Sequence, residues 1–220
     1  MSAAPTPPEP QAFGPSAFAA ATGADARVMA DMEIFRDLLA TWNTRMNLVG
    51  PSALANFWLR HAYDSAQLLD LAPAATVWAD LGAGAGFPGL VLAILLKDTP
   101  GVRIHLVESM AKRCLFLRDV IAALDLPAEV HNARAETVHI PGVEVVTARA
   151  CAPLDRLLAF AWPLLGNKRA DQAVGLFLKG ENSDQELTEA RRLWDFQLER
   201  QASRSDPSGQ ILRIERLRRV

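Results

Sequence analysis

Three glycines stand at alternate positions directly after a run of apolar residues. They are Gly82, Gly84 and Gly86, and the segment reads Val-Trp-Ala-Asp-Leu-Gly-Ala-Gly-Ala-Gly-Phe-Pro-Gly over residues 77–89. Glycine adopts positive φ and has no Cβ to keep a ligand away from the backbone, and Pro88 suits the first turn of a helix. A strand, a glycine turn and a helix start, in this order, bind nucleotide-like cofactors in open α/β sheets.

The spacing of these glycines separates two classes of cofactor. A dinucleotide turn places its third glycine three residues after the second, but here Phe87 holds that position. A sulfonium cofactor has no pyrophosphate, so its turn can lack that glycine. The turn therefore predicts S-adenosylmethionine rather than NAD. We expect Asp80, two residues before the first glycine, to hold the cationic amino group of the methionine moiety directly or through water; an ordinary strand-end acid is the alternative.

Further candidates follow the next predicted strands. Glu108 ends the second strand, where an acid can accept hydrogen bonds from both ribose hydroxyls. The alternative is an acid placed to suit the dipole of the following helix. After the third strand, the backbone of Ala135 and Glu136 could read the adenine edge, although a plain polar loop would look the same.

The end of the fourth predicted strand bears on the acceptor atom. Many amino-group methyltransferases carry an Asn/Asp-Pro-Pro-aromatic tetrad there, whereas residues 147–150 read Thr-Ala-Arg-Ala. An exocyclic amine must lose protons, but guanine N7 offers an in-plane lone pair at neutral pH. Methylation at N7 needs positioning more than a general base. We therefore assign no catalytic acid or base.

Composition limits the class of protein. Half of the 220 residues are hydrophobic and the formal net charge is −2, so an RNA substrate would have to be contacted locally. Cys114 and Cys151 belong to no pair or cluster with metal-ligand spacing, and no apolar stretch approaches the length of a membrane span. Without a secretory signal either, we expect a cytoplasmic protein with no metal and no membrane contact.

The predicted elements place these residues in one α/β domain. We expect a disordered or loosely attached arm over residues 1–24, and a single methyltransferase domain over residues 25–220, with N-terminal helices at 25–72 and a Rossmann-like core at 73–220. In the N-terminal part, Asp25 is the expected N-cap of the first helix, and a second helix should expose Arg60, Asp64 and Gln67. Predicted strands are 76–81, 103–107, 128–132, 144–147 and 174–178. Predicted helices are 87–97, 109–124, 154–165 and 184–194. A closing antiparallel hairpin is expected over 196–201 and 210–217.

Seven segments, in order, resemble one family: the ribosomal RNA small subunit methyltransferase G family, also called glucose-inhibited division protein B. The matching segments are Trp42-Asn43 with Met46-Asn47-Leu48, Arg60-His61 with Asp64-Ser65, the turn from Asp80 to Gly89, Lys112-Arg113 with Phe116-Leu117, Arg134-Ala135-Glu136, Ala148-Arg149-Ala150, and Leu178-Lys179-Gly180.

The resemblance implies a class I S-adenosylmethionine-dependent methyltransferase fold: a mostly parallel sheet with a C-terminal antiparallel hairpin and an N-terminal helical cap. It implies methyl transfer to N7 of a guanine in the decoding-region loop of bacterial 16S ribosomal RNA, with naked RNA or the small ribosomal subunit as partner. We expect the enzyme to be a monomer. The implied cofactor contacts are Gly82, Phe87, Ala135, Glu136 and Arg149, the last at the methyl-transfer mouth. Candidate RNA contacts are Asn43, His61, Lys112, Arg113 and Lys179. A class I methyltransferase acting on a small molecule or a protein is the alternative.

Overall fold

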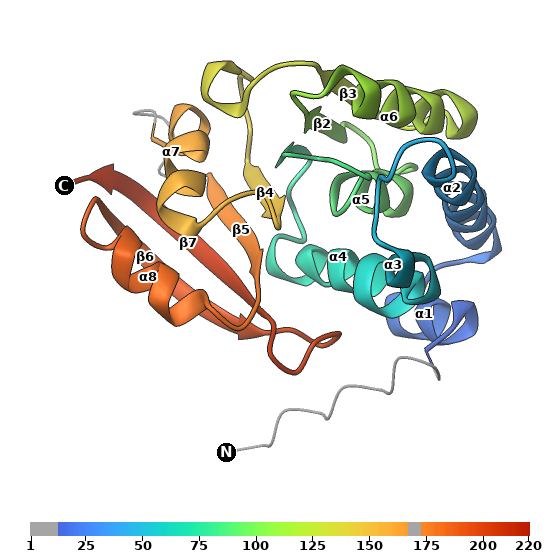
Figure 1. Ribbon diagram of the computed structural model, residues 1–220, viewed down its shortest axis with the longest axis horizontal. Coiled ribbons are helices and arrows are strands. Elements are labelled where there is room, and N and C mark those ends of the chain that lie inside the picture. The colour runs from blue at the N-terminus through green and yellow to red at the C-terminus, as the bar shows by residue number, and fades with distance from the viewer. Residues whose placement is uncertain (1–12, 167–172) are drawn as a thin grey trace.

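The core of the protein is a seven-stranded sheet in the order β3-β2-β1-β4-β5-β7-β6 (Figure 1). The computed structural model describes residues 13–166 and 173–220. Strand β7 is antiparallel to both of its neighbours, and the other strand pairs are parallel. The strands are β1 Val77–Leu81, β2 Arg103–Val107, β3 Ala128–His131, β4 Val145–Arg149, β5 Val174–Lys179, β6 Trp194–Ala202 and β7 Gln210–Arg219.

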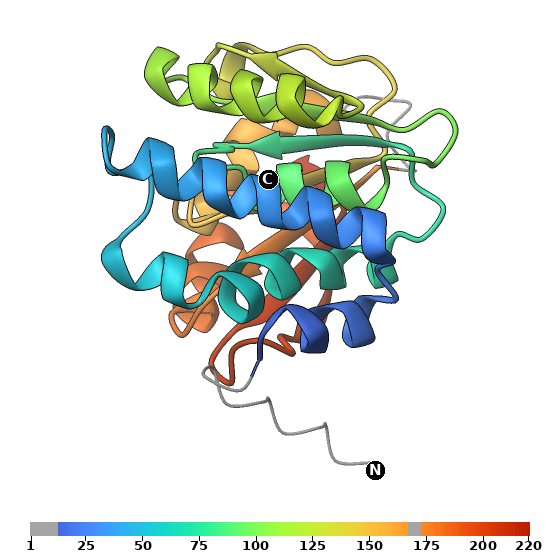
Figure 2. The same ribbon diagram turned by 90° about the vertical axis from the view of Figure 1, so that its right-hand side faces the viewer.

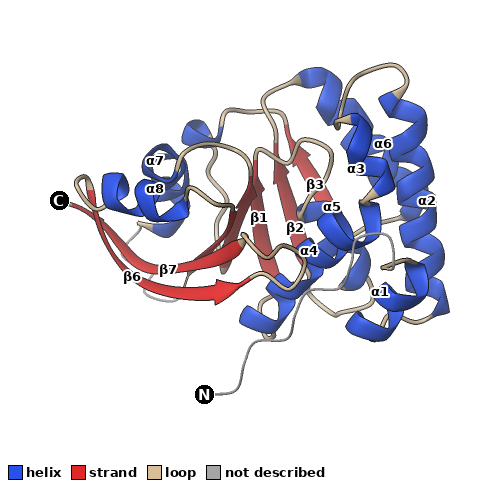
Figure 3. Cartoon of the chain, turned by 60° about the horizontal axis from the view of Figure 1, so that its bottom comes forward, coloured by secondary structure: helices blue, strands red, loops and turns tan. Residues whose placement is uncertain are grey.

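Helices cover both faces of the sheet. Helices α2, α4, α5 and α6 lie on one face, and α7 and α8 lie on the other (Figures 1 and 3). The helices are α1 Pro15–Thr22, α2 Ala26–Asn43, α3 Pro51–Ala55, α4 Asp64–Ala66, α5 Gly89–Leu95, α6 Ala111–Leu124, α7 Leu154–Leu165 and α8 Ser183–Ala190. Shorter segments are the π-helix η1 Phe57–Tyr63 and the 3-10 helices η2 Gln67–Leu71 and η3 Ala135–Thr137. This order confirms the predicted class I methyltransferase sheet and its closing hairpin.

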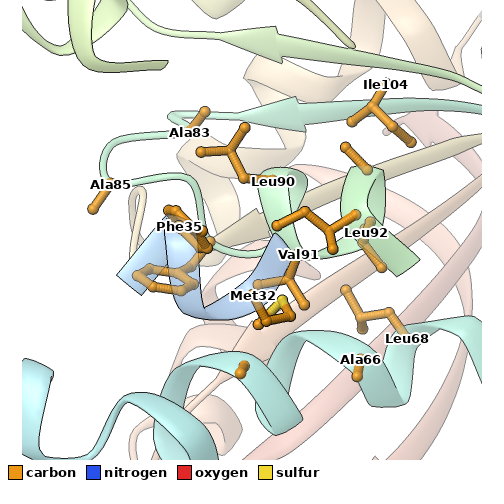
Figure 4. Packing of buried hydrophobic residues seen from close by; sticks show 14 of the residues in the cluster. Met32, Phe35, Ala66, Leu68, Ala83, Ala85, Leu90, Val91, Leu92 and Ile104 are labelled. Atoms are coloured by element: carbon orange, nitrogen blue, oxygen red, sulfur yellow. The ribbon is translucent and has the colours of Figure 1, made fainter. Parts of the chain in front are cut away.

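The N-terminal helices are fixed to the sheet through α5. Met32 and Phe35 of α2 are fully buried and face Leu90 and Val91 of α5 (Figure 4). Asp25 is the predicted N-cap, because its Oδ1 accepts a hydrogen bond from the Val28 N–H at 2.9 Å. Figure 2 shows α6, α2, α4 and α1 in one layer in front of the sheet. Because α5 directly follows the glycine turn, this packing ties the helical cap to the predicted cofactor site.

The expected loose arm is corrected for residues 13–24. Helix α1 forms there, and Phe18 on it is fully buried with its ring 5.4 Å from that of Trp58. The scarcity of charge that suggested disorder reflects a helix that packs on the cap. Residues 1–12 lie outside the described part of the chain.

Two helix predictions are also wrong in detail. The segment after Pro51 is broken into α3, η1, α4 and η2, and it buries Gln67 and most of Asp64, which we expected to be exposed. The helix expected to reach Trp194 ends at Ala190, and Trp194 instead begins β6. The helical spacing of its apolar residues misled us, since Trp194 packs against Trp162 of α7 from a strand.

Across the described residues, no helix is both long and apolar enough to span a bilayer.

Candidate cofactor and substrate site

The glycine turn forms the loop between β1 and α5, and all three glycines have positive φ: 70° at Gly82, 54° at Gly84 and 89° at Gly86. A Cβ on Gly82 would lie 2.6 Å from the Cys151 sulfur, so the backbone passes too close to the end of β4 for any side chain. At Gly84, by contrast, a Cβ would meet only the Gly82 carbonyl oxygen, at 3.6 Å. The open space beside Gly84 is where a ligand can approach the backbone.

Asp80 lies beneath this turn rather than beside it. Its side chain is 1 % exposed, with Oδ2 accepting from the Gly89 N–H at 3.0 Å and Oδ1 from the Thr147 hydroxyl at 3.2 Å. Burial raises the pKa of this carboxyl to about 7, against the opposing effect of these two hydrogen bonds. Asp80 therefore braces β1, β4 and the start of α5. A contact of Asp80 with the amino group of a methionine moiety, directly or through water, stays a prediction.

Glu108 faces the turn from the end of β2, as expected. Its Oε2 accepts from the Gly84 N–H at 3.0 Å, and its Oε1 accepts from the Met110 N–H at 2.7 Å. The guanidinium of Arg113 lies 3.7 Å from Oε2. Each carboxylate oxygen has two lone pairs, so both can still accept a hydroxyl. Glu108 and the open space at Gly84 together fit a ribose-bearing cofactor.

Arg149 ends β4 and packs against the aromatic residue of the turn. Its guanidinium lies 5.4 Å from the centre of the Phe87 ring, and the His61 ring stacks on Phe87 at 4.9 Å. Arg149 also donates to the Arg60 carbonyl oxygen at 2.7 Å and to Nδ1 of His61. Burial, Arg149 and Arg60 lower the pKa of His61 to about 3, so its imidazole is neutral and accepts from Arg149. His61 is therefore not placed to act as a base.

Asp64 holds Arg149 from the helical cap. Its Oδ2 lies 3.5 Å from the Arg149 guanidinium, while Oδ1 accepts from Ser203 at 3.1 Å, Ser205 at 2.5 Å and Gln67 at 2.9 Å. Ser203 and Ser205 lie in the turn between β6 and β7. One carboxylate thus joins the cap, the end of β4 and the C-terminal hairpin; we call this group the Arg149 wall (Arg60, His61, Asp64, Arg149, Ser203 and Ser205).

A cavity of about 610 Å³ opens beside this wall. Its lining combines the wall, apart from Ser205, with the β4–α7 loop and the end of β5. The residue after Arg149, Ala150, has φ of 50° in the left-handed region, which costs a non-glycine residue about 1 kcal/mol. Ala150 lines the cavity next to Arg149, so the strained residue lies at the cavity wall.

The structure divides the predicted RNA contacts. Asn43 accepts from the Val49 N–H at 3.0 Å. Lys179 is 8 % exposed and bonds the Ala152 carbonyl oxygen at 2.7 Å and Glu186 at 2.6 Å. Lys112 is exposed at the start of α6, and Arg113 beside it is half-buried, with its guanidinium 3.7 Å from Glu108. Of these four, Lys112 is the most exposed, Lys179 braces the β4–α7 loop beside the cavity, and Asn43 holds the loop that follows α2.

The cofactor contacts predicted for Ala135 and Glu136 stay predictions, and several other contacts in the site were not predicted. Ala135 and Glu136 form η3 beyond β3, with Ala135 half-buried and Glu136 exposed. The contacts of Cys151 with Gly82, and of Thr147 with Asp80, were not predicted. Ser203 and Ser205 were missed as well, because they are more than 130 residues from Asp64 and only the Asp-Pro-Ser-Gly turn beside them is visible in the sequence.

Solved structures share this fold at low sequence identity. A methyltransferase from Aquifex aeolicus described as dependent on S-adenosylmethionine has a TM-score of 0.55 and 14 % identity, covering 78 % of this chain and 96 % of its own. A mutant of MtNAS in complex with S-adenosylmethionine has a TM-score of 0.52 and 13 % identity, covering 93 % of this chain and 84 % of its own. These likenesses identify the fold as that of S-adenosylmethionine-dependent methyltransferases.

Sequence relatives are much closer. Ribosomal RNA small subunit methyltransferase G of Caulobacter vibrioides is 57 % identical over 92 % of both chains. The protein of the same name from Parvibaculum lavamentivorans is 44 % identical over 94 % of this chain and 92 % of its own. The family described as rRNA small subunit methyltransferase G matches residues 28–209. With the predicted glycine turn, the acid that faces it and the arginine at the end of β4 all in place, the chain belongs to the ribosomal RNA small subunit methyltransferase G family.

Proposed function

We propose that this protein transfers the methyl group of S-adenosylmethionine to N7 of a guanine in the decoding-region loop of bacterial 16S ribosomal RNA. The observation that carries the proposal is 57 % identity over 92 % of the chain to a ribosomal RNA small subunit methyltransferase G. The glycine turn and Glu108 support it, because they provide close backbone approach and ribose acceptors side by side.

The chemistry of the site agrees with a ring-nitrogen acceptor. S-adenosylmethionine supplies an electrophilic methyl group on a sulfonium, and its positive charge passes to the purine during transfer. No proton has to leave N7 beforehand, so a positioned lone pair is sufficient. In the Arg149 wall, His61 is neutral and already accepts a hydrogen bond from Arg149. This arrangement supports binding and orientation rather than proton abstraction.

We assign the two sides of the site to two partners. Asp80 serves the cofactor side either through a water-mediated contact or as a brace of the turn. The other residues on this side are Gly82, Gly84, Gly86, Phe87, Glu108, Ala135, Glu136 and Arg149. The RNA enters from the cavity side, where the Arg149 wall leads to the reacting methyl group. Lys112 and Arg113, at the start of α6, contact phosphates. His61 and Lys179 support the frame of the cavity, and Asn43 holds the loop that follows α2.

We further propose that the predicted domain of residues 25–220, together with helix α1 packed on its cap, acts as one monomeric unit in the cytoplasm, where the small ribosomal subunit is assembled. Sedimentation of the enzyme with and without 16S RNA tests the monomer. A stable dimer that persists at the enzyme concentration of the assay would contradict it.

The decisive experiment is methyl transfer from radiolabelled S-adenosylmethionine to two substrates, intact small subunits and naked 16S RNA. We expect label in RNA, and borohydride reduction followed by aniline cleavage should map it to one 7-methylguanosine in the decoding region. Label found only in protein or in small molecules would overturn the proposed substrate. Calorimetry that shows binding of NAD but not of S-adenosylmethionine would overturn the cofactor.

A further inference from the structure

Two histidines and a glutamate meet on the edge of the sheet, away from the cavity. His105 lies on β2, and Glu129 and His131 lie on β3; the strand register pairs His105 with Glu129 and Val107 with His131. Since alternate residues share a face of a strand, all three side chains project from the same face. The opposite face of β2 carries Ile104 and Leu106, which are buried under the helices.

The donor atoms are already close together. His105 Nδ1 lies 3.0 Å from His131 Nε2 and 3.9 Å from a carboxylate oxygen of Glu129. All three ligand atoms lie within 4.8 Å of one another. Tetrahedral coordination with bonds of about 2.05 Å separates two nitrogens by roughly 3.3 Å. The two rings would therefore need to part by only a few tenths of an ångström to bind one ion.

The chemistry of the donors selects the class of ion. Imidazole suits Zn²⁺, Cu²⁺, Ni²⁺ and Fe²⁺, whereas Mg²⁺ and Ca²⁺ take oxygen ligands. Three protein ligands leave a fourth position for water. The His105 side chain is 12 % exposed and that of Glu129 is 70 % exposed, so the donor set opens to solvent on the side of the carboxylate.

We propose that His105, Glu129 and His131 bind one zinc-class divalent metal ion at the β2–β3 edge. This departs from our expectation of no metal, which considered only the two cysteines. The ion would tie β3, an edge strand, to β2 next to Glu108, whose N–H donates to the His131 carbonyl oxygen at 3.1 Å. Asn132, the residue after His131, donates to the Glu108 carbonyl oxygen at 3.1 Å. Binding thus holds the strand ends that position the cofactor acid.

The test is Zn²⁺ binding to tag-free protein, measured by competition with a chromophoric chelator. We expect one Zn²⁺ per chain with micromolar or tighter affinity, and a rise in Tm of roughly 5 °C at a hundredfold excess over Kd. Co²⁺ should give the visible absorption of a tetrahedral site.

Variants identify the ligands. His131→Gln should weaken Zn²⁺ binding at least 100-fold. Glu129→Gln changes an exposed side chain and leaves the fold undisturbed, and it should weaken Zn²⁺ binding about tenfold. The matched control is His139→Gln, an exposed histidine outside the cluster, which should bind as the parent does. Binding weaker than millimolar in the parent protein, or tight binding that survives both His131→Gln and Glu129→Gln, would overturn the site. None of these readouts depends on methyl transfer.

Discussion

The glycine turn and the Arg149 wall meet at Phe87, but they are built in different ways. The turn is held mainly by its own backbone groups and by two carboxylates, Asp80 and Glu108, which accept hydrogen bonds from the Gly89 and Gly84 N–H groups. The wall is held by side chains from three distant segments, with Asp64 of the cap bonded to Arg149, Ser203 and Ser205. The turn therefore tolerates little change in backbone geometry, whereas the wall is sensitive to the charge of a few side chains.

The largest effect should come from adding a side chain within the turn. Gly82→Ala places a Cβ 2.6 Å from the Cys151 sulfur and forces alanine to adopt φ of 70°. We expect a loss of about 2–4 kcal/mol in the free energy of unfolding, and a loss of S-adenosylmethionine affinity of more than 100-fold. Urea denaturation and calorimetry measure the two quantities.

Two further variants separate the causes. Cys151→Ala in the Gly82→Ala background removes the collision with the sulfur but leaves the tight Cβ contact at 3.3 Å and the unfavourable φ, so it should restore part of the stability and little of the binding. Gly50→Ala is the matched control, because Gly50 has φ of −65° and no atom within 4 Å of an added Cβ. Parent-like binding by Gly82→Ala would show that the wall, rather than the turn, determines cofactor affinity.

The wall is best tested at Asp64. In Asp64→Asn the side-chain oxygen can still accept from Ser203, Ser205 and Gln67, but an amide N–H₂ would face the Arg149 guanidinium. We expect the free energy of unfolding to fall by about 2–3 kcal/mol. The kcat of methyl transfer should fall 10–100-fold, while KM for RNA should change less than threefold. The reason is that the change displaces Arg149 but removes no contact with the RNA.

Asp70→Asn is the control for this change. Asp70 lies in the same segment but pairs with Arg204 at the surface, where its side chain is 57 % exposed. It should leave both kcat and stability near the parent values. If Asp64→Asn loses stability without losing kcat, Asp64 supports the fold and does not position Arg149.

The same contrast explains what could be predicted from sequence. The turn, β2 and α7 were placed correctly because their signals are local: glycine spacing, short apolar runs and helical periodicity. The roles of Asp64 and Gln67 were missed because both look like an exposed helix face until the β6–β7 turn covers them. His105 and His131 are likewise separated by a whole helix, and only the parallel register brings their rings together.

A pH experiment tests how Asp80 serves the turn. Its pKa of about 7 lies above the usual value of a carboxyl, so between pH 4 and 7 the folded state holds a proton that the unfolded state releases. The parent protein should therefore lose about 1–2 kcal/mol relative to Asp80→Asn as the pH rises from 5.5 to 8. Urea denaturation of both proteins at the two pH values measures this difference.

The same variant decides whether Asp80 contacts the cofactor. Because the carboxylate is buried under Gly89 and Thr147, we expect Asp80→Asn to reduce S-adenosylmethionine affinity less than tenfold. A loss of more than 100-fold in a variant with parent-like stability would show that Asp80 contacts the methionine moiety directly.

The smallest effect is expected at the rim of the wall. Arg60 and Asp206 form an ion pair at 2.7 Å between η1 and the β6–β7 turn, with side chains that are 41 % and 20 % exposed. Asp206→Asn makes the same chemical change as Asp64→Asn, and its oxygen can still accept from the Ser208 N–H. A partly exposed ion pair contributes about 1 kcal/mol or less to the free energy of unfolding. Tm should therefore shift by only a few degrees, and kcat should change less than threefold. An effect on kcat as large as that of Asp64→Asn would mean that the wall acts as one network out to its rim, and that Arg149 depends on the hairpin as much as on the cap.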